Sequence, residues 1–131
     1  MTPYAYVDSS ALVKLVIEEV ETSALQADIA ARAGLVCSRL GAVELTRASR
    51  RRLSKRRFST VSEVIEAVVW VDITPAILDA AATLERPGLR TLDAIHLATI
   101  LSLDERELDV ITYDSRLAAA VRQHGYPIVI P

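Results

Sequence analysis

Four acidic residues stand where the neighbouring residues are apolar or where a helix is expected to begin. Asp8 follows Tyr-Val, Asp93 lies between Thr-Leu and Ala-Ile-His, Asp114 follows Ile-Thr-Tyr, and Glu44 lies within Ala-Val-Glu-Leu. A carboxylate in such a setting costs free energy unless a cation or hydrogen-bond donors meet it. Carboxylate oxygens are hard ligands that suit Mg²⁺ or Mn²⁺. The four acids together therefore predict a divalent-metal site.

Each acid also has a simpler explanation. Asp8 and Asp114 could cap the helices that follow them, and Asp93 could complement a helix dipole. Glu44 could pair with Arg47 on a solvent-facing side of its helix. Asp93 argues most strongly for a site, because its helix is apolar on most sides and a buried acid there needs a partner.

Three polar residues near these acids are expected to support them. His96 lies one helical turn from Asp93, and we expect a buried or supporting histidine rather than a direct ligand. Thr112 and Ser10 could each hold a metal-bound water through the hydroxyl, or could be a plain strand residue and a plain helix cap. The single cysteine, Cys37, excludes an internal disulfide and is expected to be a buried strand residue.

A dense basic segment contrasts with the net charge of −2. It contains no acid, and its charged residues are Arg47, Arg50, Arg51, Arg52, Lys55, Arg56 and Arg57. Such a segment attracts polyanions. The alternative is a solvated helix face without a partner, although like charges this dense weaken a helix.

Short apolar segments alternate with amphipathic ones along the chain. Strands are predicted at 4–8, 35–37, 69–73, 110–111 and 128–130, with helices between them. Ser9 or Ser10 is expected to cap the first helix, Thr74-Pro75 to begin another and Thr91 to cap the helix that carries Asp93, while Gly34 is expected to end the helix over 22–33. This order predicts an α/β fold with a mostly parallel sheet.

The predicted sheet gives the acids a common place. Ligands of open α/β sheets bind at the carboxyl ends of the strands. Asp8 ends the first strand and Asp114 follows the fourth, so they share a crevice if those strands are neighbours. Asp93 and Glu44 lie in early turns of helices that can reach the same edge.

Length and composition set the remaining limits. A chain of 131 residues that is 51% hydrophobic is expected to form one folded domain, residues 1–131. No apolar run approaches the roughly 20 residues of a membrane helix, and the N-terminus does not resemble a signal peptide, so a cytoplasmic location is expected. The phosphate-binding, dinucleotide-binding and Gly-x-Ser-x-Gly motifs are missing.

The acidic motifs resemble those of the PIN-domain ribonucleases, and among these the VapC toxins of type II toxin–antitoxin systems. The resemblance rests on Val-Asp8-Ser-Ser-Ala-Leu, Ala-Val-Glu44-Leu-Thr-Arg, Leu-Asp93-Ala-Ile-His-Leu-Ala and Ile-Thr-Tyr-Asp114-Ser-Arg-Leu, in this order along nearly the whole chain. It implies a three-layer α/β/α fold with a five-stranded parallel sheet of order 3-2-1-4-5. It also implies a Mg²⁺- or Mn²⁺-dependent endoribonuclease, a homodimer and a cognate VapB-type antitoxin.

The resemblance leads to a hypothesis for the chemistry. Asp8 and Asp93 are predicted to hold the principal metal, with Glu44 and Asp114 completing the pocket directly or through water. Metal-activated water would cut RNA, with tRNA or ribosomal RNA as expected substrates, and leave a 5′-phosphate. The basic segment would bind RNA phosphates, and Tyr113 could stack a base.

Two other functions remain open from the sequence. The first is a non-catalytic module that binds a protein partner and whose acids are helix caps. The second is a metal-dependent DNA nuclease of the same fold.

Overall fold

The computed structural model describes residues 4–52, 58–86 and 88–131. The strands are β1 (Ala5–Val7), β2 (Leu35–Ser38), β3 (Val68–Val71), β4 (Asp109–Ile111) and β5 (Ile128–Val129). The helices are α1 (Ser9–Val16), α2 (Thr22–Ala30), α3 (Arg39–Arg52), α4 (Phe58–Ala67), α5 (Pro75–Thr83), α6 (Thr91–Leu103) and α7 (Ser115–Gln123).

The strands form one parallel sheet in the order β3-β2-β1-β4-β5. The predicted fold class and strand order are therefore confirmed. The order makes β1 and β4 neighbours, with Val7 paired to Ile111 in register. This pairing places the ends of the first and fourth strands side by side, as the crevice requires.

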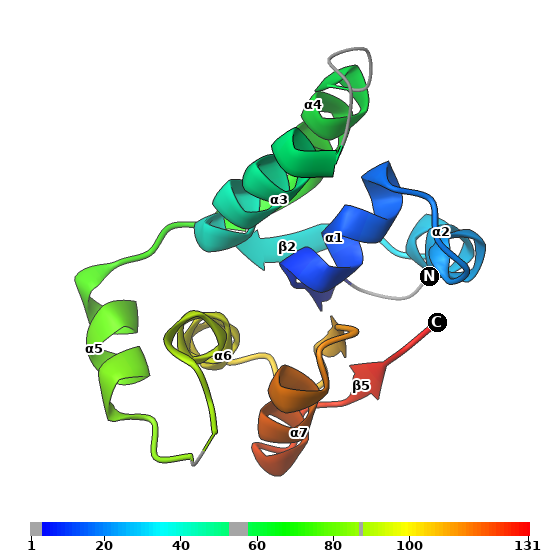
Figure 1. The fold of residues 1–131 in the computed structure, drawn as a ribbon. Coiled ribbons are helices and arrows are strands. Elements are labelled where there is room, and N and C mark those ends of the chain that lie inside the picture. The colour runs from blue at the N-terminus through cyan, green and yellow to red at the C-terminus, as the bar shows by residue number, and fades with distance from the viewer. Residues whose placement is uncertain (1–3, 53–57, 87) are drawn as a thin grey trace.

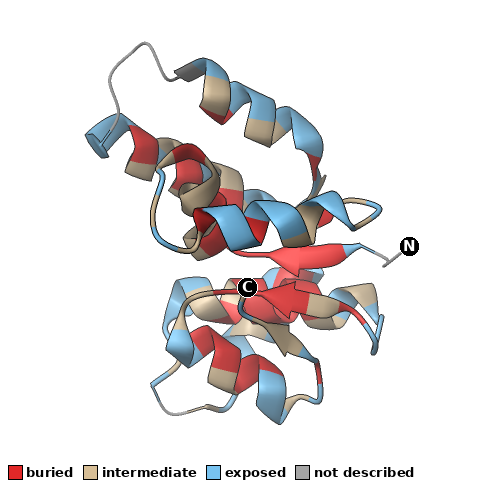
Figure 2. Ribbon diagram, turned by 90° about the vertical axis from the view of Figure 1, so that its right-hand side faces the viewer, coloured by how far each residue is buried: buried red, intermediate tan, exposed pale blue. Residues whose placement is uncertain are grey.

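Helices cover both faces of the sheet (Figure 1). One core joins the sheet to α1, α2, α3 and α4, and the other joins it to α6 and α7. The central strands β1, β2 and β4 are mostly buried between these layers, whereas β3 and β5 at the sides of the sheet are more exposed (Figure 2). Side chains alternate along β1, because Ala5 and Val7 enter the first core while Tyr6 enters the second.

The helix starts differ partly from the predictions. Asp8, rather than Ser9 or Ser10, caps α1, because its carboxylate accepts the backbone N–H of Ala11. Thr91 is the first residue of α6 rather than its cap, and the residue before it makes no side-chain capping bond. The predicted start at Thr74 is confirmed, since its hydroxyl accepts from the backbone N–H of Ile77.

Gly34 does not end a helix as predicted. Helix α2 already ends at Ala30, and Gly34 directly precedes β2. A Cβ atom at Gly34 would lie only 2.5 Å from the Tyr4 ring, so the glycine is explained by close packing there. After α7, which ends at Gln123, Gly125 has a φ of +87° that favours glycine.

Helices α3 and α4 project beyond the sheet as a pair (Figure 1). The exposed arginines near the end of α3 lie on this projection, while Lys55, Arg56 and Arg57 lie outside the described residues. None of the helices in the described parts of the chain has the length and apolar character needed to cross a membrane.

Candidate metal and nucleic-acid site

The adjacent ends of β1 and β4 bring Asp8 and Thr112 together. The backbone N–H of Asp8 donates to the carbonyl of Ile111 at 3.4 Å, which continues the strand pairing by one residue. The hydroxyl of Thr112 donates to Oδ2 of Asp8 at 2.7 Å. Residues 104 positions apart are thus joined at the carboxyl edge of the sheet.

The carboxylate of Asp8 is only 4% exposed and is held on both oxygens. In addition to Thr112 on Oδ2, Oδ1 accepts from the Ser10 hydroxyl at 2.6 Å and from the Ala11 backbone N–H at 3.3 Å. Burial nevertheless raises the pKa of Asp8, although the hydrogen bonds from Ser10 and Thr112 act in the opposite direction. A nearby cation would stabilise the ionised form.

The hydroxyls of Ser10 and Thr112 each donate to Asp8 and accept from the β4–α7 turn. Ser10 accepts the backbone N–H of Tyr113 at 2.9 Å, and Thr112 accepts that of Asp114 at 3.0 Å. These contacts orient Asp8 and couple it to the turn that carries Asp114. The expected contact of either hydroxyl with a metal-bound water stays a prediction.

Asp114 caps α7. Its Oδ1 accepts the backbone N–H groups of Arg116 at 2.9 Å and Leu117 at 3.2 Å. Within the part of the chain that the structure describes, Oδ2 has no hydrogen-bond partner. Capping is therefore a correct explanation for Asp114, as it is for Asp8, yet it leaves one oxygen of Asp114 available.

Asp93 lies in the first turn of α6 and is half-buried. Its pKa is raised first by burial, then by the charge of Asp114, and more weakly by Glu44. A hydrogen bond from the Arg90 backbone opposes this rise. Asp93 thus lies near enough to Asp114 and to Glu44 for each of their charges to repel its own, although the three acids come from separate stretches of the chain.

Glu44 of α3 pairs with a histidine rather than with Arg47, the alternative partner suggested by the sequence. Its Oε1 lies 2.7 Å from Nε2 of His96 on α6. The His96 side chain is buried, and its Nδ1 lies 2.6 Å from the Tyr6 hydroxyl. Both ring nitrogens are therefore engaged by protein groups.

The four predicted acids lie at the carboxyl edge of the sheet, but their side chains are not already arranged to coordinate an ion. Among the described residues, no three Asp, Glu, His or Cys side chains form a cluster that could hold a metal as they stand. The donor chemistry nevertheless fits Mg²⁺ or Mn²⁺, because all four donors are hard oxygens. Asp93, Asp114 and Glu44 are only partly buried, so their side chains have room to turn towards an ion.

The described arginines of the basic segment fall into two groups, those that line a groove and those that lie outside it. Arg47 and Arg51 line a groove of about 570 Å³ between α1 and α3, and Glu44 lines the same groove. Arg52 lies 3.7 Å from Glu19, and Arg50 is exposed outside the groove lining. The spacing of Glu44, Arg47 and Arg51 along α3 places them on one helical face.

Sequence reasoning missed Tyr6, which contacts His96 beneath the site. Its signal was a tyrosine in a short buried strand, since a buried phenol usually finds a hydrogen-bond partner. Lys14 was also missed as a lining residue of the groove, but Glu19 and Glu21 already pair with it at 2.8 and 3.2 Å.

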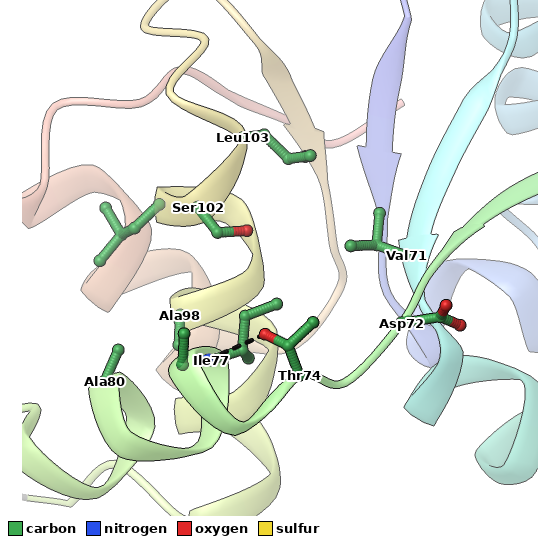
Figure 3. Close-up of a pocket in the computed structure, with 10 residues that line it drawn as sticks. Val71, Asp72, Thr74, Ile77, Ala80, Ala98, Ser102 and Leu103 are labelled. Carbon is green, nitrogen blue, oxygen red and sulfur yellow. Dashed lines mark hydrogen bonds between the residues drawn. The ribbon is translucent and has the colours of Figure 1, made fainter.

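A second cavity, of about 600 Å³, lies between the end of β3 and the helices α5 and α6 (Figure 3). Its lining is mostly apolar, with Asp72, Thr74 and Ser102 as polar exceptions. The Thr74 hydroxyl is occupied by the Ile77 backbone (Figure 3). None of the four predicted acids lines this cavity, so it does not share the chemistry of the carboxyl edge.

Comparison with known proteins agrees with this geometry. Residues 5–123 match the PIN domain family. Ribonuclease VapC35 of Mycobacterium tuberculosis is 37% identical over 130 residues, which cover 96% of each chain. The fold is similar to that of a chain in a toxin–antitoxin complex from Klebsiella pneumoniae, with a TM-score of 0.73 and 20% identity over 97% of each chain. It is also similar to Mycobacterium tuberculosis VapC20, described as a sarcin-ricin loop cleaving toxin, with a TM-score of 0.71 and 15% identity over 88% of this chain and 94% of that one. The chain therefore belongs to the PIN-domain family and, within it, to the VapC proteins.

Proposed function

We propose that this protein is a Mg²⁺- or Mn²⁺-dependent endoribonuclease and the toxin of a toxin–antitoxin pair. The observation that carries the proposal is the convergence of Asp8, Glu44, Asp93 and Asp114 at the carboxyl edge of β1 and β4. Burial and mutual repulsion disfavour ionised acids there, and a divalent cation would offset both. The ribonuclease name of the VapC35 relative supports the activity.

The proposed roles of the acids follow from their surroundings. Asp8, held by three hydrogen bonds, and Asp93, on the apolar helix α6, would be the principal ligands. Glu44 and Asp114 each keep one oxygen without a hydrogen bond among the described residues, and that oxygen would bind the ion directly or through water. When bound, the ion would lower the pKa of a coordinated water and offset charge on the phosphoryl oxygens.

The groove between α1 and α3 supports RNA as the substrate. Arg47 and Arg51 line it beside Glu44 and form no ion pair within the described ranges of the chain. Phosphates bound by the two arginines would bring the backbone next to the acids, positioning the RNA without selecting a sequence. VapC20 is described as cutting the sarcin-ricin loop, so a structured RNA such as ribosomal RNA or tRNA is the proposed class.

The same groove supports an antitoxin partner. Val43 and Leu92 expose 55% and 48% of their surface, although both are apolar and line the groove beside Glu44. A VapB-type antitoxin segment with apolar side chains would cover them and block the acids. The Klebsiella pneumoniae structure is a toxin–antitoxin complex, in keeping with this proposal. The homodimer implied by the resemblance is a further proposal, which light scattering of the purified protein tests.

The test of the proposed function is cleavage of matched RNA and DNA oligonucleotides with Mg²⁺, Mn²⁺ or EDTA. We expect cleavage of RNA only, and only with a metal. Cleavage of DNA with equal rate would favour the DNA nuclease.

The non-catalytic module remains a specific rival, because Asp8 and Asp114 do cap helices. A helix cap does not need a divalent ion. If Mg²⁺ and Mn²⁺ neither raise the thermal midpoint nor support cleavage, the acids have only structural roles, such as the caps of Asp8 and Asp114 and the pairing of Glu44 with His96, and the enzymatic proposal is wrong.

A further inference from the structure

A buried chain of hydrogen bonds runs from the sheet to Glu44. The backbone N–H of Ser38 donates to the Tyr6 hydroxyl at 3.1 Å. The same hydroxyl lies 2.6 Å from Nδ1 of His96, whose Nε2 lies 2.7 Å from Oε1 of Glu44. The chain thereby connects β2, β1, α6 and α3, and it ends at a predicted metal ligand.

The proton positions in this chain follow from its partners. A carboxylate accepts hydrogen bonds only, so Nε2 of His96 must carry a proton to bond Glu44. A neutral imidazole then has a bare Nδ1, which accepts from the Tyr6 hydroxyl. The oxygen of that hydroxyl still accepts from Ser38, so every group uses its donor or acceptor once.

Burial makes this arrangement rigid. Tyr6 is fully buried and His96 is 3% exposed, with the two rings packed edge to face at a centroid distance of 5.9 Å. With a proton on Nε2 and a bare Nδ1 on His96, the Tyr6 hydroxyl is the donor of the 2.6 Å bond between them. The thiol of Cys37 also lies near this hydroxyl, but a thiol is a much weaker acceptor than an imidazole nitrogen.

Glu44 needs such support more than Asp8 does. Asp8 has a short side chain held by three donors, whereas Glu44 is a longer side chain on the wall of an open groove. Its hydrogen bond to His96 uses Oε1, and Oε2 has no partner among the residues that the structure describes. The histidine thus fixes the carboxylate through one oxygen and leaves the other facing no protein donor.

We propose that Tyr6 and His96 are positioning residues of the metal site, with Tyr6 fixing the His96 tautomer that donates to Glu44 and His96 holding that carboxylate ready for the ion. This proposal rests on the proposed function, because it assigns a purpose to a contact beneath the same site. It adds Tyr6, which packs in the core formed with α6 and α7, to the residues on which metal binding depends.

The test compares Mn²⁺ affinity, measured by electron paramagnetic resonance, in Tyr6→Phe and in the matched control Tyr126→Phe. Tyr126 is a mostly buried tyrosine of the same core, and within the described residues it makes no hydrogen bond to His96 or Glu44, so its variant reports the loss of a tyrosine hydroxyl away from the site. We expect Tyr6→Phe to weaken Mn²⁺ binding by about tenfold or more, as is typical when a group supporting a ligand is removed. Tyr126→Phe should leave the affinity unchanged.

The same pair of variants in a Glu44→Gln background shows whether Tyr6 acts through Glu44. If it does, Tyr6→Phe should have almost no further effect on Mn²⁺ affinity in that background. The full loss in both backgrounds would mean a general structural role and would overturn the proposal.

The tautomer is tested on the wild-type protein without metal, by nitrogen-15 NMR of the His96 ring. A proton on Nε2 and a bare Nδ1 support the proposal, and a proton on Nδ1 overturns it even if Tyr6→Phe does not fold. Wild-type protein that binds no Mn²⁺ would overturn both the metal site and the positioning role. Mn²⁺ binding with unchanged affinity in Tyr6→Phe would overturn the positioning role alone.

Discussion

Two groups of acids, one at each edge of the sheet, differ in whether an arginine or lysine of the chain pairs with them. At the amino edge, where β4 begins, the buried Arg32 side chain donates to Asp109 at 2.8 Å and to Asp28 at 2.7 Å. These bonds raise the pKa of Arg32, with the hydrogen bond that Arg32 donates to Asp28 as the largest cause. The acids of the amino edge thus have a cation supplied by the chain itself.

Within the described part of the chain, the four acids of the proposed metal site at the carboxyl edge have no such cation, although Arg39 pairs with Asp72 at 2.7 Å beside β2 and β3 at the same edge. Among the described residues, no arginine or lysine pairs with Asp8, Asp93 or Asp114, and Glu44 pairs only with His96. The pKa of Asp8 and that of Asp93 are raised by burial, in contrast to ordinary paired carboxylates. The comparison shows that the chain supplies its own cation, Arg32, to acids that serve stability. The four acids of the carboxyl edge, which we call the uncompensated edge, have no cation from the described residues and are therefore suited to an external one.

The largest expected effect comes from removing a carboxylate at the uncompensated edge. Asp93→Asn should lower metal-dependent RNA cleavage by more than about a hundredfold, which exceeds the usual loss from a group that only supports a ligand. The free energy of unfolding without metal should not fall, because the variant removes a charge that burial and Asp114 disfavour. Cleavage kinetics and urea unfolding measure the two quantities.

Asp104→Asn is the matched control for this variant. Asp104 is an exposed acid at the other end of α6 with a φ of 52°, a conformation that asparagine tolerates. Its activity should equal that of the wild type. Equal activity in Asp93→Asn as well would remove Asp93 from the site.

At the compensated edge the effect should fall on stability instead. Arg32→Met leaves Asp28 and Asp109 without their cation, and it should lower the free energy of unfolding by about 2 to 3 kcal/mol. The activity per folded molecule should not change. Urea unfolding measures the loss, and Arg122→Met on the exposed side of α7 should cost less than about 0.5 kcal/mol. Equal stability of the two variants would contradict the structural role of Arg32.

The groove gives a smaller effect that concerns binding alone. Replacing Arg47 and Arg51 by Ala should reduce the slope of log affinity for single-stranded RNA against log salt by about 1.4, if each arginine contacts one phosphate. Filter binding to the inactive Asp93→Asn protein measures the slope. The control replaces Arg50 and Arg52, which carry the same charge on α3 but do not line the groove. Equal slopes in the two pairs would place the RNA elsewhere.

The smallest effect is a difference in pH dependence without metal. For an acid whose pKa is raised by folding, the folded state binds more protons than the unfolded state above the ordinary aspartate pKa of about 4. Stability from Asp93 is therefore present at low pH and is lost as pH rises through its folded pKa. Urea unfolding in EDTA measures this effect between about pH 4 and about pH 7. As pH rises over this range, the free energy of unfolding should fall less in Asp93→Asn than in the wild type. A larger loss in the variant would show that the sign is wrong.

Much of the fold followed from local patterns. The alternation of apolar strands and amphipathic helices predicted the parallel sheet, and the Thr74-Pro75 pair marked a helix start correctly. Where several residues could serve the same local role, the sequence left the choice open, as among Asp8, Ser9 and Ser10 for the cap of α1, which is Asp8. Gly34 was misjudged because its reason is the Tyr4 ring, a contact that no local pattern contains.

By itself the sequence determined which acids are present, their order, and the family to which the chain belongs, because short motifs and side-chain periodicity are local properties. Only the tertiary structure decided the partners of those acids. Glu44 and His96 are 52 positions apart, and Tyr6 and His96 are 90 apart. Their contacts depend on strand order, on which face of β1 carries Tyr6, and on how α3 and α6 pack. These are long-range properties, so local spacing offered only Arg47, one turn from Glu44, as an alternative partner, whereas the fold supplies the buried His96 on another helix.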